Sequence, residues 1–191
     1  MNKLPVIAIF DVGKTNKKLL LFDEQYKMVY EENRKLEEIK DEDDFTCEDV
    51  KALTQWLKDT FAALLKNDLY EIKGVNISGY GASLVYLDEH LHVSLPLYNY
   101  LKPYPVHLRE KFYNTYGGES LVAKQTASPV LGNLNSAMQL YRLKYEKPEL
   151  FAQIKYALHL PQYLSFILTG KVCSDITSIG SHTNLWDFQK N

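Results

Sequence analysis

The side chains best placed to do chemistry stand near the start of the chain, where an apolar run ends in Asp11. A polar turn and a pair of lysines come next: Gly13, Lys14, Thr15, Asn16, Lys17 and Lys18. A second apolar run then begins. This pattern predicts a strand, a tight turn and a second strand, with a carboxylate at the tip of the first strand.

Each part of this turn suits the phosphate tail of a nucleotide. A glycine allows a ligand to approach the backbone closely. Backbone N–H groups, polar side chains and ammonium groups can gather around phosphate oxygens. We expect these contacts from Gly13, Lys14, Thr15, Asn16 and Lys18. Asp11 is placed to meet a divalent cation, either directly or through water.

Two other interpretations of this segment compete with that one. Gly13-Lys14-Thr15 matches the end of the P-loop motif, but the first glycine of that motif would fall on Ala8. A P-loop lysine also opens a helix, whereas an apolar strand follows here, so both tests of the P-loop fail. A plain β-hairpin with a lysine-rich tip stays open on this segment alone, because short D-x-G-x-T patterns are common.

Three segments, in order along the chain, carry a resemblance to known proteins. The first hairpin resembles the phosphate-binding hairpin of the actin, hexokinase and Hsp70 superfamily, except at Lys14, where a small or hydroxyl residue is usual. Residues 75–88, VNISGYGASLVYLD, resemble the I-S-G-x-x-x-x-L-V-x-L-D region of the FGGY carbohydrate kinases. Residues 163–187 resemble that family's Y-L-x-x-x-L-T-G…D…S…L-x-D stretch, in which Asp175 and Asp187 are structural. The pattern is most similar to the rhamnulose, fuculose, xylulose and ribulose kinases.

The resemblance implies an α/β fold: a ribonuclease-H-like (actin-like ATPase) domain with a mixed sheet, opened by an antiparallel β-meander, and flanking helices. It implies that residues 1–191 are an incomplete N-terminal kinase domain, with the C-terminal domain outside this chain. The implied activity is ATP-dependent phosphorylation of a sugar hydroxyl, with a ketose as the substrate. Asp11 would be the catalytic residue that organises Mg²⁺, and the general base would lie beyond residue 191.

The resemblance also places part of a sugar site. In FGGY kinases the residues after I-S-G, and a segment after the next L-D, contact the sugar. These positions here are Tyr80, Gly81, Ala82, Tyr98, Asn99 and Tyr100. Many relatives carry a W-x-D-x-R-like sequence in the second segment, whereas residues 97–101 read LYNYL. The identity of the substrate therefore does not carry over.

Composition narrows the class of protein. The 191 residues suffice for one domain with a sizeable core. A net charge of −2 argues against nucleic acid or an anionic membrane held by bulk charge. No apolar run approaches a membrane span, and the start lacks a secretory signal. Cys47 and Cys173 are expected to be free thiols in a reducing compartment, the cytoplasm. A homodimer stays open.

Periodicity and turn residues predict the remaining elements. We expect strands over about 26–33, 72–78, 84–87 and 156–160, and helices over about 46–66, 105–116, 134–147 and 161–168. The strand over 72–78 is expected to be buried and parallel to its neighbour. The acidic run 37–44 is typical of a solvated loop without a ligand. Most aromatic rings between 95 and 116 are expected to pack against the core, although such rings can also stack on sugars.

Two rival functions remain. A nucleic-acid hydrolase of the same fold type also begins with an aspartate on the first strand, but it needs further acids around two metals. The turn after Asp11 and the near-neutral charge do not suit it. A non-catalytic module that binds a sugar or nucleotide is the other rival. The five scattered histidines are expected to be structural.

Overall fold

The first strand sets the architecture through its alternating side chains. The computed structural model describes residues 3–190. Strand β1 (Leu4–Val12) buries every second side chain from Val6 to Val12, and strand β2 (Lys17–Phe22) does the same from its first residue. Side chains in a strand alternate between the two faces of a sheet. One face of this sheet is therefore apolar and the other carries Asp11.

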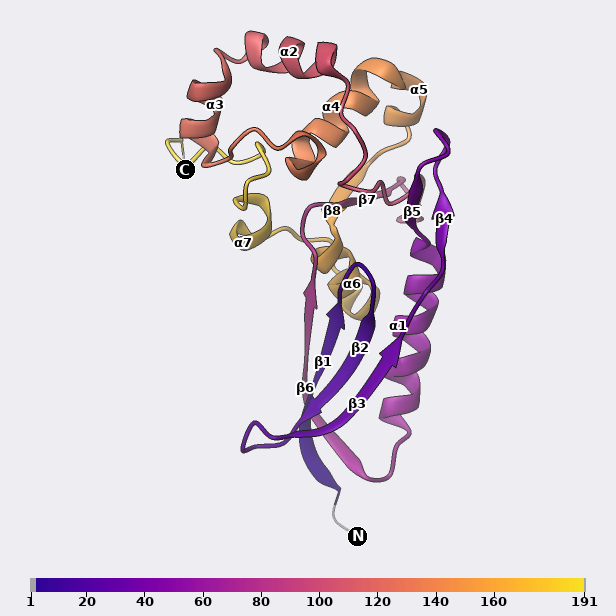
Figure 1. Cartoon of the computed structure of the whole chain (residues 1–191). Helices are drawn as coiled ribbons and strands as arrows, with labels where there is room; N and C mark the ends of the chain where they lie inside the picture. The colour runs from indigo at the N-terminus through magenta and orange to yellow at the C-terminus, as the bar shows by residue number, and fades with distance from the viewer. Residues whose placement is uncertain (1–2, 191) are drawn as a thin grey trace.

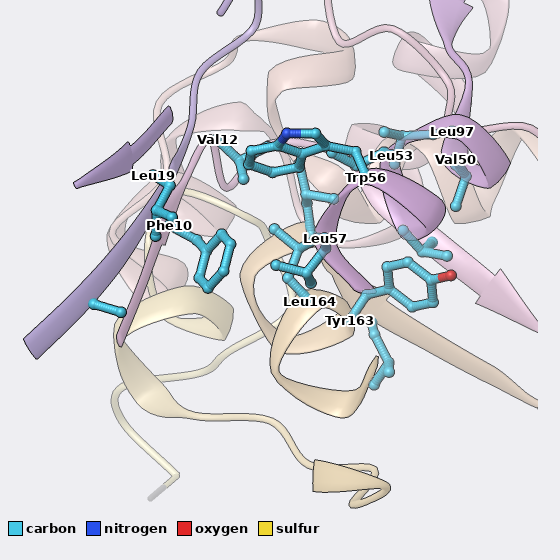
Figure 2. Packing of buried hydrophobic residues seen from close by; sticks show 14 of the residues in the cluster. Phe10, Val12, Leu19, Val50, Leu53, Trp56, Leu57, Leu97, Tyr163 and Leu164 are labelled. Atoms are coloured by element: carbon cyan, nitrogen blue, oxygen red, sulfur yellow. The ribbon is translucent and has the colours of Figure 1, made fainter. Parts of the chain in front are cut away.

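Helix α1 (Val50–Leu65) covers the apolar face. Phe10 on β1 meets the ring of Trp56 edge to face at 5.8 Å, and Leu53 and Leu57 are fully buried beside them (Figure 2). Asp49 caps the helix by accepting hydrogen bonds from the N–H groups at 51 and 52. Our expectation that the helix begins at Thr46 is wrong, because strand β5 (Thr46–Glu48) occupies that position.

The central sheet is mixed and has the order β3-β2-β1-β6. Strand β2 runs antiparallel to both β1 and β3 (Met28–Arg34), and β6 (Tyr70–Gly79) runs parallel to β1 after the α1 crossover. The parallel pairing is as expected. The expected burial of β6 is wrong, because none of its residues is buried. The strand lies at the edge of the sheet and has no partner on its outer side within residues 3–190.

A second, mostly helical lobe lies at the end of the molecule away from the N-terminus (Figure 1). Its elements are strand β7 (Leu84–Leu87), α2 (Val106–Thr115), α3 (Glu119–Thr126), η1 (Gly132–Leu134), α4 (Ser136–Glu146), α5 (Pro148–Phe151), strand β8 (Tyr156–His159) and α7 (Ile176–Ile179). Strands β7 and β8 pair antiparallel, and α6 (Leu160–Thr169) returns to the core beside α1. Gly170 ends α6 with φ of 70°, as its position in the sequence predicts. No helix within residues 3–190 is long and apolar enough to cross a membrane.

The aromatic segment packs as predicted for most of its rings. Tyr98, Phe112 and Tyr113 are buried, whereas Tyr116 is exposed. Phe112 contacts Tyr141 on α4 edge to face at 5.1 Å. Phe112, Tyr113 and Tyr141 belong to a small apolar core of the helical lobe, and Tyr98 packs with Tyr86 in another; both are separate from the core under the sheet.

The acidic run 37–44 is exposed to solvent, as its composition predicts, except at Asp41, but it is not a plain loop. Part of it forms strand β4 (Glu38–Lys40), which pairs with β5. Asp41 is buried and forms an ion pair with Lys102, which also reaches Asp43 at 2.7 Å. The side chains of Arg142 and Lys147 contact Asp43 at 2.7 and 2.8 Å. Because cations far away in the sequence neutralise it, this run anchors the β4–β5 hairpin to the helical lobe.

These contacts predict a specific acid sensitivity. The hydrogen bond from Lys102, followed by that from Lys147, holds the pKa of Asp43 well below its usual range. A carboxyl with a lowered folded pKa stabilises the fold above its unfolded pKa of about 4, and this stabilisation disappears as the pH falls below that value. Asp43→Asn should therefore lose less stability between pH 5 and pH 2 (about 1 kcal/mol, since the side chain is one-third exposed).

Urea unfolding followed across that pH range measures the effect. Asp44→Asn is the matched control, because Asp44 is 79% exposed and pairs only with Lys40 among the described residues. Equal acid sensitivity of the Asp43 variant and the control would contradict the assignment.

Candidate functional site

The turn between β1 and β2 presents free backbone donors at one end of the sheet. The N–H of Gly13 donates to the carbonyl of Asn16 at 3.0 Å and closes the turn. The N–H groups of residues 14–16 have no hydrogen-bond partner within residues 3–190. A Cβ at position 13 would lie 3.2 Å from the Asn16 carbonyl oxygen, so glycine is needed here for close approach rather than for an unusual φ.

Asp11 stands beside this turn on the face of the sheet opposite α1. It is paired with Lys18 on β2 and with Ser78 on β6, so the three residues form one row across the sheet. Directly opposite residues in a sheet point to the same face. The row lies at the carboxyl ends of the parallel strands β1 and β6. Ligands of open α/β sheets bind in the crevice outside such ends.

Two of the predicted phosphate-binding lysines already have acidic partners. Lys14 pairs with Glu38 on β4, and Lys18 with Glu31 on β3 at 3.0 Å. All four side chains are partly exposed to solvent. Such surface ion pairs contribute only about 0–1 kcal/mol. Either lysine can therefore exchange its glutamate for another anion without a large cost to the fold.

Lys17, which the sequence did not single out, is buried beneath the turn. Its side chain is 1% exposed, and its Nζ lies 2.5 Å from Oε1 of Glu48 on β5. The same Nζ donates to the carbonyls of Gly13 and Lys14 at 3.1 and 3.2 Å. The other carboxylate oxygen of Glu48 accepts a hydrogen bond from the Tyr80 hydroxyl at 2.8 Å. One buried carboxylate thus joins the turn between β1 and β2, the predicted phosphate turn, to the first predicted sugar segment.

The two predicted sugar segments lie against each other. The rings of Tyr80 and Tyr100 are 5.8 Å apart, and the Ser83 hydroxyl donates to the Tyr98 carbonyl at 2.8 Å. Gln139 on α4 donates to the Ala82 carbonyl at 2.7 Å and supports the first segment from below. Segments 80–83 and 97–100, which the resemblance assigns to one sugar site, therefore lie in contact after β6.

Tyr98 and Asn99 use their polar groups inside the protein. The Tyr98 hydroxyl donates to Glu42 at 2.7 Å, and burial raises the pKa of Tyr98 far above its usual value, so the hydroxyl stays protonated. The Asn99 amide donates to the carbonyl of Thr46 at 3.1 Å and its oxygen accepts from the N–H of Leu101. Gly81 and Ala82 offer backbone groups only. A role of these residues in sugar binding stays a prediction.

The residues near the turn suit a magnesium ion that is held mainly by the phosphate oxygens of a nucleotide and by water. No group of three or more His, Cys, Asp or Glu side chains gathers around a possible metal position within residues 3–190. Mg²⁺ in phosphate sites is bound by one or two carboxylates, several waters and the phosphate oxygens themselves. Asp11, a single half-buried carboxylate next to free N–H groups, fits that arrangement.

Strand β6 also borders a hollow of about 750 Å³, which lies beside α6 and α7. Ser78, which pairs with Asp11 across the sheet, and Gly81 are among the residues that line it. The Ser136 hydroxyl lies 2.9 Å from Nε2 of His159, a pair that the sequence did not indicate. Both residues are buried, so this pair is structural and not a nucleophile with its base.

Residues 6–191 match the family described as "FGGY family of carbohydrate kinases, N-terminal domain". The chain therefore belongs to the FGGY family.

Three similar proteins illustrate this membership. The rhamnulokinase of Halalkalibacterium halodurans is 26% identical over 93% of this chain and 39% of its own length. The L-fuculokinase of Haemophilus influenzae is 22% identical over 96% of this chain and 42% of its own length. The crystal structure of xylulose kinase from Rhodospirillum rubrum shares the fold, with a TM-score of 0.85 over 96% of this chain and 38% of its own at 15% identity. The chain spans about two-fifths of the length of these proteins.

The close contact at position 13 gives a prediction about the turn. Gly13→Ala forces the Asn16 carbonyl to move by a few tenths of an ångström, because its Cβ would meet that oxygen at 3.2 Å. We expect Mg·ADP affinity to fall about tenfold, since small displacements of positioning groups are costly. Isothermal titration of the full-length protein measures it.

Gly74→Ala on β6 is the matched control, because nothing lies within 4 Å of the Cβ that it adds. Mg·ADP affinity unchanged in both variants would remove the turn from the nucleotide site.

Proposed function

We propose that this chain is part of an ATP-dependent sugar kinase, in which it supplies the phosphate-binding turn and part of the sugar site. The observation that supports this most is geometric. The turn after β1 and the two segments after β6 emerge from the same end of the sheet, and Glu48 connects them directly. A phosphate donor and its acceptor must meet in such a place.

In this proposal the sugar is a ketose, and its hydroxyl receives the γ-phosphoryl group of ATP. The names of the similar rhamnulokinase and L-fuculokinase support a ketose. The antiparallel run β1-β2-β3 followed by parallel β6 supports a ribonuclease-H-like, actin-like domain. The compartment we propose is the cytoplasm.

The residues of the turn would divide the work of phosphoryl transfer. Asp11 orders Mg²⁺ or its waters, and the metal neutralises charge on the transferred group when bound. The free N–H groups at 14–16, with Thr15, Asn16 and the partly exposed Lys14 and Lys18, hold the phosphate oxygens. Tyr80 to Ala82, with Tyr98 and Asn99, border the sugar. The proton of the attacking hydroxyl needs a carboxylate base, which we place, by resemblance, outside residues 1–191.

Asp11→Asn in the full-length protein tests the assignment of this residue. The amide keeps the shape but removes the negative charge that attracts the metal, so kcat should fall at least about a hundredfold. Asp23→Asn is the matched control, since Asp23 accepts two backbone hydrogen bonds in the β2–β3 turn away from the site. A coupled assay of ADP release with a panel of ketoses gives the rates. Near-normal turnover of the Asp11 variant would exclude Asp11 from the mechanism.

The 191-residue chain by itself should phosphorylate sugars poorly or not at all. Domain closure excludes water and assembles the active site in enzymes of this kind, and this chain spans about two-fifths of the length of its relatives. The same ADP-release assay, run on the isolated chain and on the full-length protein, measures the difference. Steady ketose-dependent ADP release from the isolated chain would contradict this expectation.

A non-catalytic module that binds a sugar or nucleotide is the second candidate. Sugar binding by the full-length protein without any turnover would support the module over the kinase.

A further inference from the structure

The buried ammonium group of Lys17 has a complete set of partners, which is unusual for a lysine. Lysine is almost never fully buried unless it is paired. Its three N–H donors meet three acceptors here: the Glu48 carboxylate and the carbonyls of Gly13 and Lys14. A peptide whose carbonyl points down toward Lys17 has its following N–H on the opposite side. Lys17 therefore keeps the N–H groups of residues 14 and 15 facing away from the core.

Glu48 is fixed from several directions. It is only 5% exposed, and its backbone forms a β-bridge with Leu97, the first residue of segment 97–100. Its side chain holds Lys17 on one oxygen and Tyr80 on the other. Burial, together with the carboxylate of Glu48, raises the pKa of Tyr80 far above its usual value, so the phenol remains a donor. Glu48 thus contacts the phosphate turn and both segments that follow β6.

The stability of the fold does not explain why this ion pair is buried. Replacing a buried ion pair with apolar residues of similar size is often neutral or stabilising, because desolvation of the charges is expensive. The pair does fix a geometry, since both carboxylate oxygens and all three ammonium protons have defined partners. The arrangement is therefore suited to positioning rather than to holding the fold together.

We propose that Glu48 is a positioning residue that, through Lys17 and Tyr80, fixes the phosphate turn relative to the sugar segments. This inference rests on the proposed kinase function. Loss of the pair should leave the fold intact but let the turn carbonyls rotate, so that the N–H groups of the turn no longer converge on the phosphates. The effect should appear mainly in the KM for Mg·ATP.

The test uses Lys17→Met combined with Glu48→Gln in the full-length protein. Either change alone leaves one buried charge without its partner and destabilises the fold. The double variant removes both charges, and the amide oxygen introduced at position 48 can still accept from the Tyr80 hydroxyl. We expect a melting temperature within a few degrees of wild type, with the KM for Mg·ATP raised about tenfold at saturating ketose.

The matched control is Asp41→Asn combined with Lys102→Met. It removes a second buried ion pair, which ties the same hairpin to the helical lobe without contact to the turn. Its KM for Mg·ATP should stay within about twofold of wild type. Glu48→Asp gives a further measurement, because it keeps the charge but withdraws the carboxylate by one methylene. It should raise the same KM about threefold.

The outcomes separate the two proposals. If the wild type turns over and neither the double variant nor Glu48→Asp changes the KM for Mg·ATP by more than about twofold, the positioning role is wrong and the kinase stands. An equal rise in the control pair would also overturn it, because any buried charge pair would then have the same effect. If the wild type phosphorylates no ketose in the panel, the proposed kinase function fails and this inference fails with it.

Discussion

The burial of alternate side chains of β1 against α1 is the constraint on which the site depends. Val6, Ala8, Phe10 and Val12 are each at most 2% exposed, and they can only reach α1 if the residues between them face the other way. A slip of one residue would bury Asp11 and expose Phe10. The apolar core therefore fixes the direction of the carboxylate, and the parallel register with β6 fixes what stands beside it.

The β4–β5 hairpin fixes the position of the turn and of the helical lobe through two buried ion pairs. It carries two buried carboxylates, Asp41 and Glu48, and each is matched by a lysine from a distant segment. An unpaired buried charge costs several kcal/mol, about 3–5 when one partner is removed. The two pairs thus exclude arrangements in which the hairpin, the turn and the helical lobe come apart. Such pairs specify one arrangement of these segments more than they add to the free energy of unfolding.

The sequence predicted those parts of the molecule whose signal is local. The apolar run that ends at Asp11, the apolar stripe of α1 and the glycine that ends α6 are all short-range features, and the structure bears out the strand and the two helices that they predict. The sequence did not reveal the ion pairs of the acidic run, because the partners of Asp43, which are Lys102, Arg142 and Lys147, lie 59 to 104 residues away. The composition of the run shows its carboxylates but does not show the distant cations that pair with them. Lys17 and Glu48 were missed for the same reason, since each looks like an ordinary surface charge until the fold brings them together.

The turn itself combines fixed and replaceable charges. Three lysines follow Gly13 within five residues, and each has its own glutamate on β3, β4 or β5. The pair at Lys17 is buried and cannot be broken cheaply, whereas the pairs at Lys14 and Lys18 are open to solvent and weak. A phosphate tail bound at this turn would meet Lys14 and Lys18, which can change partners. Lys17, buried beneath them, cannot. In the proposed kinase, the buried pair would keep the backbone donors directed at the phosphates while the two partly exposed lysines change partners. This division would let a lysine-rich turn stay ordered before any phosphate binds.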